Sequence, residues 1–382
     1  MKKRIWGFIL ALSLMAEALS GCAPLTPELL EQLQRSISEA AGAIAETEAE
    51  LKADTHADGK PWIDSELSEN LSADMPTDPR QDFHLYASKN WLTSHTIPEG
   101  YSYWDHYAER GLEVKNQCIG LLKDESLLGS EAELARSLNS LVLDWDARNE
   151  RGVSEILENA EKLLKAESLS DITELLLDKD NVNLFYDFYA TGPTADLNDS
   201  SVYVVEVSRG SLLLSDAAEY RERSEYGDML YTYRKTIFTY LAGRLGMDET
   251  EAGERFDEAI AYDTLLAQAC MTSEDQMSAD YFDRINNRMS FADIGELTGS
   301  YPLAQLLKNN GFEYDGVYIV TEPDYFRQLD QVFDEAHFEG IRDKIYVRYL
   351  LGYVDVIDRE AYEFENRIYN EIFGAEGTIP FG

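Results

Sequence analysis

The sequence predicts a mainly α-helical lobe with a small β-hairpin, preceded by a signal peptide, a spacer helix and a linker. Three observations favour this fold class. Apolar residues recur at spacings of three and four along most of the chain, which is the period of an amphipathic helix. Only residues 184–189 and 201–208 change to aromatic and β-branched runs, which are typical of strands. Hydrophobic residues make up 44% and charged residues 27% of the chain, as in ordinary globular proteins.

The first 21 residues have the layout of an export signal. Residues 2–4 are basic, residues 5–19 are apolar, and the tetrapeptide Leu-Ser-Gly-Cys ends at Cys22. Such a short apolar core behind a charged start is typical of a signal peptide and not of a membrane span. The tetrapeptide resembles a bacterial lipobox, so we predict lipid attachment at Cys22; an ordinary signal cleaved at a small residue is the alternative. The protein is then expected outside the cytoplasm, lipid-anchored to a bacterial membrane surface.

Residues 22–53 are predicted to be the lipidated N-terminus and a spacer helix. Thr26 is placed to cap this helix and Pro27 falls in its first turn. A heptad-like seam follows, formed by Leu30, Leu33, Ile37, Ala40, Ile44, Thr47 and Leu51. We interpret it as a spacer because Ala40 and Thr47 weaken the seam; a partner-binding helix is the alternative. Residues 54–77 are polar and contain Gly59, Pro61 and Pro76, which predicts an extended linker.

The remaining residues, 78–382, are predicted to form the helical domain, beginning with two helices. The first carries Phe83, Tyr86, Ala87, Asn90 and Trp91 on one face, with Asp78 as its cap and Pro79 in its first position. Ile97-Pro98 ends it, because proline removes a backbone donor and restricts the preceding residue. A second, longer helix is predicted to continue to Leu122 and to close back on the first.

Further helical patterns cover most of the domain. Ser130 and Glu133 have the spacing of a capping box. An apolar face follows them, made of Leu134, Leu138, Leu141, Val142 and Trp145. Helices are also predicted at 154–165, 170–177, 226–245 and 250–271, and in shorter segments to about residue 373. The two strand-like runs, separated by Gly192-Pro193 and Asn198-Asp199, predict a hairpin, and residues 317–320 are expected to be extended.

Charge and cysteine content exclude some functions. The net charge of −39 repels polyanions, so we expect no nucleic-acid partner. After Cys22 only Cys118 and Cys270 remain. We interpret both as buried small apolar residues on helical faces, with a disulfide between them as the alternative.

One ordered set of residues resembles a known family. Asp82-Phe83, Tyr86, Trp91-Leu92, Ile97-Pro98, Ser102 and Trp104, followed by a long helix, look like the opening of the neprilysin-like (endothelin-converting-enzyme-like) zinc metallopeptidases. Later segments, Leu212–Leu214 with Tyr220 and residues 280–302, resemble further family segments in the same order. The resemblance covers about residues 78–375. It implies the N-terminal half of such a peptidase, which caps the zinc lobe and restricts the cleft to peptides.

The zinc motif of that family is missing from the sequence. The family binds zinc through His-Glu-x-x-His on one helix, where two histidines four residues apart share a face. No such pair exists among the five histidines, which are His56, His84, His95, His106 and His337. The resemblance places the motif in a second half, and the sequence ends at Gly382 before that half begins. We therefore expect no catalytic residue, metal ligand or cofactor here, and no activity of the chain alone.

The resemblance also suggests two substrate-facing candidates. In animal members an arginine shortly after Ile-Pro, and a second further along the helix, face the substrate end of the cleft. Alignment on Ile97-Pro98 places Tyr103 at the first position and Gly111 at the second, with Arg110 next to it. Tyr103 and Arg110 are therefore the candidates, and a surface arginine is the alternative for Arg110.

These observations predict an extracytoplasmic lipoprotein carrying the substrate-capping half of a neprilysin-like zinc metalloendopeptidase. It would take part in proteolysis only if a zinc-bearing half is supplied separately. The expected partners are the membrane through the lipid, that separate half, and peptides. The alternative is a non-catalytic peptide- or protein-binding lipoprotein, a pseudo-enzyme. A half-lobe is expected to expose a large apolar patch, whereas a stand-alone protein is expected to fold as a soluble monomer.

Overall fold

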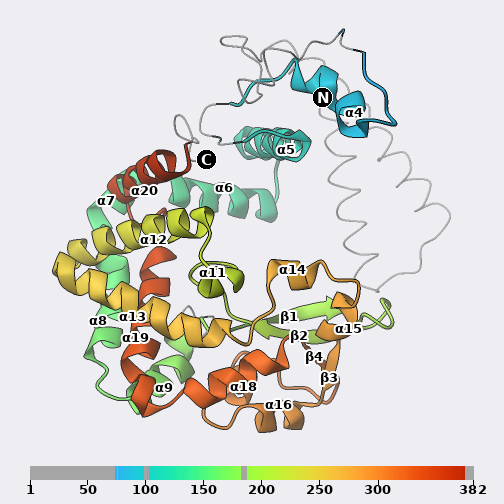
Figure 1. Cartoon of the computed structure of the whole chain (residues 1–382). Helices are drawn as coiled ribbons and strands as arrows, with labels where there is room; N and C mark the ends of the chain where they lie inside the picture. The colour runs from blue at the N-terminus through green and yellow to red at the C-terminus, as the bar shows by residue number, and fades with distance from the viewer. Residues whose placement is uncertain (1–73, 75, 99–100, 102, 182–186, 375–382) are drawn as a thin grey trace. The chain divides into compact units, whose positions relative to one another are not determined.

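The computed structural model describes residues 74, 76–98, 101, 103–181 and 187–374. The chain divides into two units, Met1–Ile97 and Pro98–Gly382. Figure 1 labels most of the described helices and strands, from α4 to α20. The predicted signal peptide, the lipid attachment at Cys22, the spacer helix and almost all of the linker lie outside the described residues. They remain predictions.

The first unit contains helix α4 (Phe83–Leu92), which begins later than predicted. Its N-cap is Asp82, whose carboxylate accepts a hydrogen bond from Leu85 N at 2.8 Å. Asp78 instead pairs with Arg80, whose Nη2 lies 2.7 Å from Asp78 Oδ2. The expected cap at Asp78 is therefore wrong, because its carboxylate is engaged by Arg80 in a turn that precedes the helix.

The second unit is mainly helical, which confirms the predicted fold class. Its α-helices are α5 (His106–Lys123), α6 (Ser130–Leu143), α7 (Trp145–Arg151), α8 (Ser154–Lys165), α9 (Leu169–Leu177), α11 (Ala218–Arg221), α12 (Glu225–Arg244), α13 (Glu249–Ala267), α14 (Ser273–Gln276), α15 (Tyr281–Ile285), α16 (Phe291–Leu297), α17 (Leu303–Asn309), α18 (Pro323–Val332), α19 (Phe338–Leu351) and α20 (Arg359–Phe373). Two 3₁₀ turns, η1 (Lys179–Asn181) and η2 (Glu335–His337), lie between them.

The start of α6 differs from the prediction. Ser130 is the first helical residue, and the N-cap is Gly129, which makes no side-chain cap. Gly129 has φ +130°, a conformation that favours glycine. The predicted capping box of Ser130 and Glu133 is therefore wrong, because a serine inside the helix is one residue too late to act as the N-cap.

A four-stranded sheet has the order β1-β2-β4-β3. β1 (Tyr189–Ala195) pairs antiparallel with β2 (Tyr203–Arg209), and β2 pairs parallel with β4 (Tyr318–Val320). β3 (Asn287–Met289) pairs antiparallel with β4. The predicted hairpin is confirmed, as is the extended run at residues 317–320, but the sheet has two more strands than the hairpin alone.

The first strand of the hairpin was placed too early in the sequence. It starts at Tyr189, so Gly192-Pro193 lies inside β1 and not between the two strands, where it was predicted. A proline is tolerated there because β1 is an edge strand of the described sheet, where one row of N–H groups needs no partner strand. The strand β3 was missed because its three residues lie in a stretch with a helical pattern.

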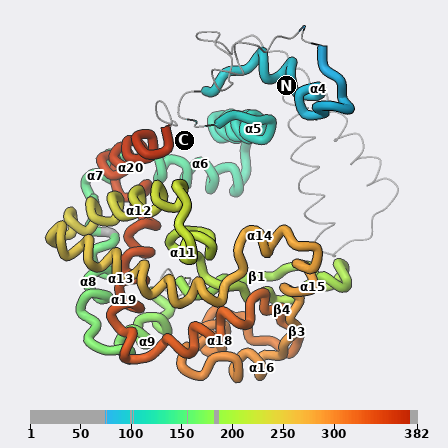
Figure 2. Tube along the Cα trace, viewed as in Figure 1, coloured from blue at the N-terminus to red at the C-terminus, as the bar shows by residue number. Residues whose placement is uncertain are grey.

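The core lies where α12, α13 and α19 pack together, with α20 beside α12 (Figure 2). Phe238 of α12 contacts two other aromatic rings, with centroids 6.0 Å from Phe256 and 5.7 Å from Tyr346. α19 buries residues all around its circumference, as expected for a helix enclosed by others. The body from α7 to α20 therefore shares one continuous core.

A cluster of buried charges lies inside this core. Lys344 of α19 is 1% exposed, and its Nζ lies 3.3 Å from Asp263 Oδ1 and 3.4 Å from Asp187 Oδ2. Asp263 also accepts hydrogen bonds from Leu213 N, at 2.6 Å, and from the Tyr220 hydroxyl. Burial lowers the pKa of Lys344, but the two carboxylates outweigh it and the net shift is upward. The cluster joins α19, α13 and the residues before β1.

A second polar cluster fixes the start of α20. Asp358 caps this helix by accepting from Ala361 N at 2.9 Å. Its oxygens also accept two hydrogen bonds from Arg244 of α12, at 3.0 and 2.6 Å. Burial raises the pKa of Asp358, but the Arg244 guanidinium and the cap outweigh burial and lower it. One carboxylate thus holds two helices.

Asp358→Asn is expected to destabilise the protein at neutral pH by roughly 1.5–3 kcal/mol, the range for hydrogen bonds to charged groups. Because the folded pKa of Asp358 is lowered, its stabilisation is present above the unfolded value of about 3.9 and is lost as pH falls through the folded pKa. Urea unfolding at pH 7, 5, 4 and 3 should show the difference shrinking below about pH 4. The exposed pair partner Asp324, changed to Asn, is the matched control; a difference independent of pH contradicts the prediction.

The two described cysteines are free thiols, with Cys270 buried and Cys118 exposed. Burial raises the pKa of the Cys270 thiol to about 12. The expectation that both are buried is wrong for Cys118, because α5 has no buried residue. Within the described part of the chain, no helix has both the length and the apolar composition to span a membrane.

Candidate functional site

The helices α4, α5 and α6 contain no buried residue. In the first unit, Phe83 and Tyr86 of α4 are exposed. In the second unit, the exposed large apolar side chains of α5, α6 and the turn between them include Tyr107, Val114, Leu128, Leu134, Leu138, Leu141 and Val142. In contrast, the body that begins at α7 buries its apolar residues in the shared core. The apolar faces of the first helices are therefore not covered by the described residues.

Helix α6 exposes its apolar face and partly buries the opposite side, which is the reverse of an ordinary surface helix. Leu134, Leu138, Leu141 and Val142, here called the α6 stripe, are 41% to 71% exposed. At roughly 100° per residue they fall within an arc of about 100°. The opposite side of the helix carries Ala132, Arg136 and Asn139, which are partly buried.

Arg136 holds α6 in this orientation. Its Nη2 donates to Leu127 O at 3.0 Å, and its Nη1 to Asp124 O at 3.4 Å, which ties the helix to the α5–α6 turn. The predicted apolar face is thus present, but within the described residues it does not join the core. Contiguous exposed apolar surface of this kind marks an interaction site.

The two substrate-facing candidates lie near the start of α5. Tyr103 is 64% exposed and precedes Asp105, the N-cap of α5. Arg110 lies on α5 itself, and its Nη1 is 2.5 Å from Glu113 Oε2, one turn along the same helix. Their substrate-facing role stays a prediction.

The described histidines make local contacts and do not gather around one point. Each of three makes a contact within its own helix or turn: His95 with Trp91, His106 with Glu109, and His337 with Asp334. Among the described residues, no group of three or more His, Cys, Asp or Glu side chains is arranged to hold a metal ion. The donor side chains of the described residues therefore do not fit a zinc ion.

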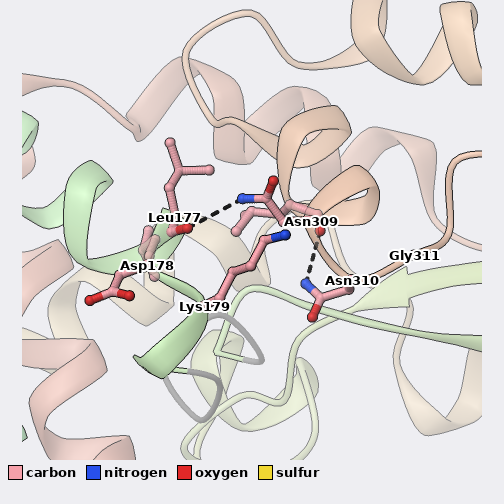
Figure 3. A pocket seen from close by; sticks show the side chains of 8 residues that line it. Leu177, Asp178, Lys179, Asn309, Asn310 and Gly311 are labelled. Atoms are coloured by element: carbon pink, nitrogen blue, oxygen red, sulfur yellow. Dashed lines mark hydrogen bonds between the residues drawn. The ribbon is translucent and has the colours of Figure 1, made fainter.

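A pocket of about 470 Å³ lies between the ends of α9 and α17 (Figure 3). Asn309 Nδ2 donates to Leu177 O at 3.2 Å, and Asn310 Nδ2 donates to Leu306 O at 2.8 Å. Lys179 extends from the end of α9 toward Asn309 (Figure 3). Both helices present carbonyl groups here, and amides and a lysine are suitable partners for helix C-termini. We interpret this pocket as the place where the C-terminal ends of α9 and α17 meet. It was not predicted because no pattern in the sequence relates residues 177 and 309.

Comparison with known proteins gives a consistent result. The family model described as peptidase family M13, for its N-terminal part, matches residues 79–380. Neprilysin-1 of Caenorhabditis elegans is 22% identical over 361 residues, covering 87% of this chain and 47% of that protein. Neutral endopeptidase of Lactobacillus helveticus is 23% identical, covering 72% of this chain and 43% of that protein. The chain thus spans about half the length of these relatives.

Solved structures share the fold. PepO from Lactobacillus rhamnosis has a TM-score of 0.66 at 15% identity, covering 80% of this chain and 48% of that chain. The inhibitor complex of the Mycobacterium tuberculosis zinc metalloprotease Zmp1 has a TM-score of 0.63 at 16% identity, covering 81% and 47%. The match of the family model over most of the helical domain is decisive. The chain belongs to peptidase family M13, the family of the neprilysin-like metallopeptidases, and residues 79–380 correspond to its N-terminal half.

Proposed function

We propose that this chain is the substrate-capping half of a zinc metalloendopeptidase, held outside the cytoplasm by a lipid on Cys22. Its membership of the M13 family and the zinc metalloprotease activity in the name of a solved relative support the reaction class. The observation that carries the proposal is the uncovered α6 stripe in a chain that spans about half of its relatives. The stripe is the surface against which a zinc-bearing half would pack.

In this proposal the chain restricts access to the cleft and contributes no catalytic residue. Peptide-bond hydrolysis belongs to residues of the zinc-bearing half, which either continues this polypeptide or is a separate chain. Burying one leucine contributes roughly 1.5–3 kcal/mol, so the four residues of the stripe supply a substantial apolar anchor. The helical body then limits the cleft to peptides, with Tyr103 and Arg110 as candidates to face the substrate.

The decisive experiment is to sequence the DNA beyond the Gly382 codon and to read it in all three frames. We expect an open frame encoding His-Glu-x-x-His. Co-expression of both parts should then cleave a quenched fluorescent peptide in a zinc-dependent manner, whereas this chain alone should give no cleavage above buffer. The control is the same pair of chains with glutamine in place of the motif glutamate.

A terminator or an unrelated gene beyond the codon would contradict the split-peptidase proposal. The alternative function, a peptide- or protein-binding lipoprotein without catalysis, would then take its place. Cleavage by the residues of this chain alone would overturn both.

A further inference from the structure

A second set of exposed apolar side chains lies at the end of the sheet that carries the β1–β2 turn. Leu197, Val202 and Tyr203 lie at the β1–β2 turn, and Met277 and Phe282 lie on the α14–α15 segment. These five residues, here called the hairpin-tip patch, are 44% to 87% exposed. They belong to elements that contribute nothing to the α6 stripe, so the patch is a separate surface.

Two polar contacts hold the two parts of the patch together. Asn286 Nδ2, directly after α15, donates to Asn198 Oδ1 in the hairpin turn at 3.2 Å. Arg288 Nη1 donates to both oxygens of Asp196 at 2.8 Å. Figure 1 shows α15 beside the end of the hairpin. The two segments that carry the five exposed apolar side chains are therefore joined to each other.

The α14–α15 segment is itself well fixed. Thr272 and Asp275 form a capping box at the start of α14. Asp275 also accepts from Arg284 Nη1 at 3.0 Å, which connects α14 to α15. The backbone hydrogen bond from Thr272 and the pairing with Arg284 lower the pKa of Asp275 to about 2. Met277 and Phe282 are therefore exposed on a braced segment.

The segments that carry the patch have more carboxylates than basic side chains. Arg284 and Arg288 are both engaged, with Asp275 and Asp196. Four carboxylates of the same segments take part in none of the ion pairs that the described residues form: Asp199, Glu274, Asp280 and Asp283. Exposed apolar side chains on segments that also carry these four carboxylates, here called the acidic rim, are complementary to an apolar segment flanked by basic side chains.

We propose that the hairpin-tip patch docks a polypeptide segment whose apolar side chains are flanked by lysine or arginine. Charge argues against the chain's own N-terminal segment as the occupant, since residues 23–73 carry eleven acidic and three basic side chains. The same acidic rim disfavours nucleic acid and anionic lipid. The proposal does not rest on the α6 stripe, because the patch and the stripe lie on different elements.

The test measures binding of a fluorescein-labelled 14-residue amphipathic peptide of leucine and lysine to the full chain by fluorescence anisotropy. The triple variant Tyr203→Ser, Met277→Ser, Phe282→Ser is expected to bind about tenfold more weakly, as at an interface whose central apolar residues are removed. The double variant Asp280→Asn, Asp283→Asn should also weaken binding and reduce its salt dependence. A leucine and glutamate peptide of the same length should not bind.

Matched controls separate the patch from the general acidity of the protein. Tyr226→Ser with Val356→Ser removes apolar side chains that are exposed elsewhere, and Glu254→Gln with Glu258→Gln removes exposed charges on α13. Both controls should bind like the unchanged protein. No binding to the unchanged protein, or an equal loss in the patch variants and the controls, overturns the proposal. Circular dichroism confirms that each variant is folded, and since the substituted side chains are exposed we expect no loss.

Discussion

Replacing Lys344 with methionine is expected to lower the free energy of unfolding by about 3–5 kcal/mol, the cost of removing one partner from a buried ion pair. Methionine fills a similar volume, so packing changes little. The carboxylates of Asp187 and Asp263 would then be buried without their shared cation. The loss should appear as a lower urea midpoint with an unchanged slope.

The matched control for Lys344 is Lys308→Met. Lys308 pairs with Glu313 at 2.9 Å, but both side chains are about half exposed, so the expected loss is at most about 1 kcal/mol. Because the folded pKa of Lys344 is raised, its contribution should persist up to the unfolded value of about 10.4 and be lost only as pH rises through the folded pKa. A variant as stable as the Lys308 control would show that the cluster does not stabilise the core.

The triple variant Leu134→Gln, Leu138→Gln, Leu141→Gln is expected to abolish most of the binding of a hydrophobic dye by the isolated chain. It should also suppress self-association, because it removes the exposed apolar surface of α6. The free energy of unfolding should change by no more than about 0.5 kcal/mol per site, as at exposed positions. Dye fluorescence, light scattering and urea unfolding on the same samples check all three.

Leu303→Ala is the matched control for the stripe. Leu303 is buried, and its truncation should cost about 2–5 kcal/mol without reducing dye binding by the folded protein. If the α6 triple variant instead lost several kcal/mol, the stripe would be covered in the isolated chain. Its role as the surface for a second half would then be wrong.

Much of the fold was predictable because helical periodicity is local. Residues 154–165 were predicted as a helix and form α8 with the same bounds, and the hairpin is present. The two capping errors were local, at Asp78 and Ser130, whereas the errors in the sheet arose where the decisive contact is distant in sequence. β3 is three residues long and exists only because β4 pairs with it, and Pro193 is tolerated only because β1 is an edge strand. Periodicity does not encode these neighbours.

The candidate surfaces were harder to predict than the fold. The pattern of Leu134, Leu138 and Leu141 identified an apolar face correctly, but a pattern does not say which element covers that face. Lys344 offered only a weak signal, its position between Ile341 and Ile345 in the stretch that forms α19. The hairpin-tip patch combines residues about 75 positions apart in sequence, such as Val202 and Met277, and only the folded sheet brings their segments together.

The parallel pairing of β2 with β4 delays completion of the sheet during synthesis. Arg209, at the end of β2, and Glu322, just beyond β4, form an ion pair across 113 residues of sequence. During synthesis the hairpin therefore emerges long before the strand that covers its inner edge. Until β4 arrives, β2 presents unpaired backbone groups that another chain is able to pair with. The sheet is therefore incomplete until residues 318–320 have been translated, and a chaperone that binds β2 before then would protect the chain from association.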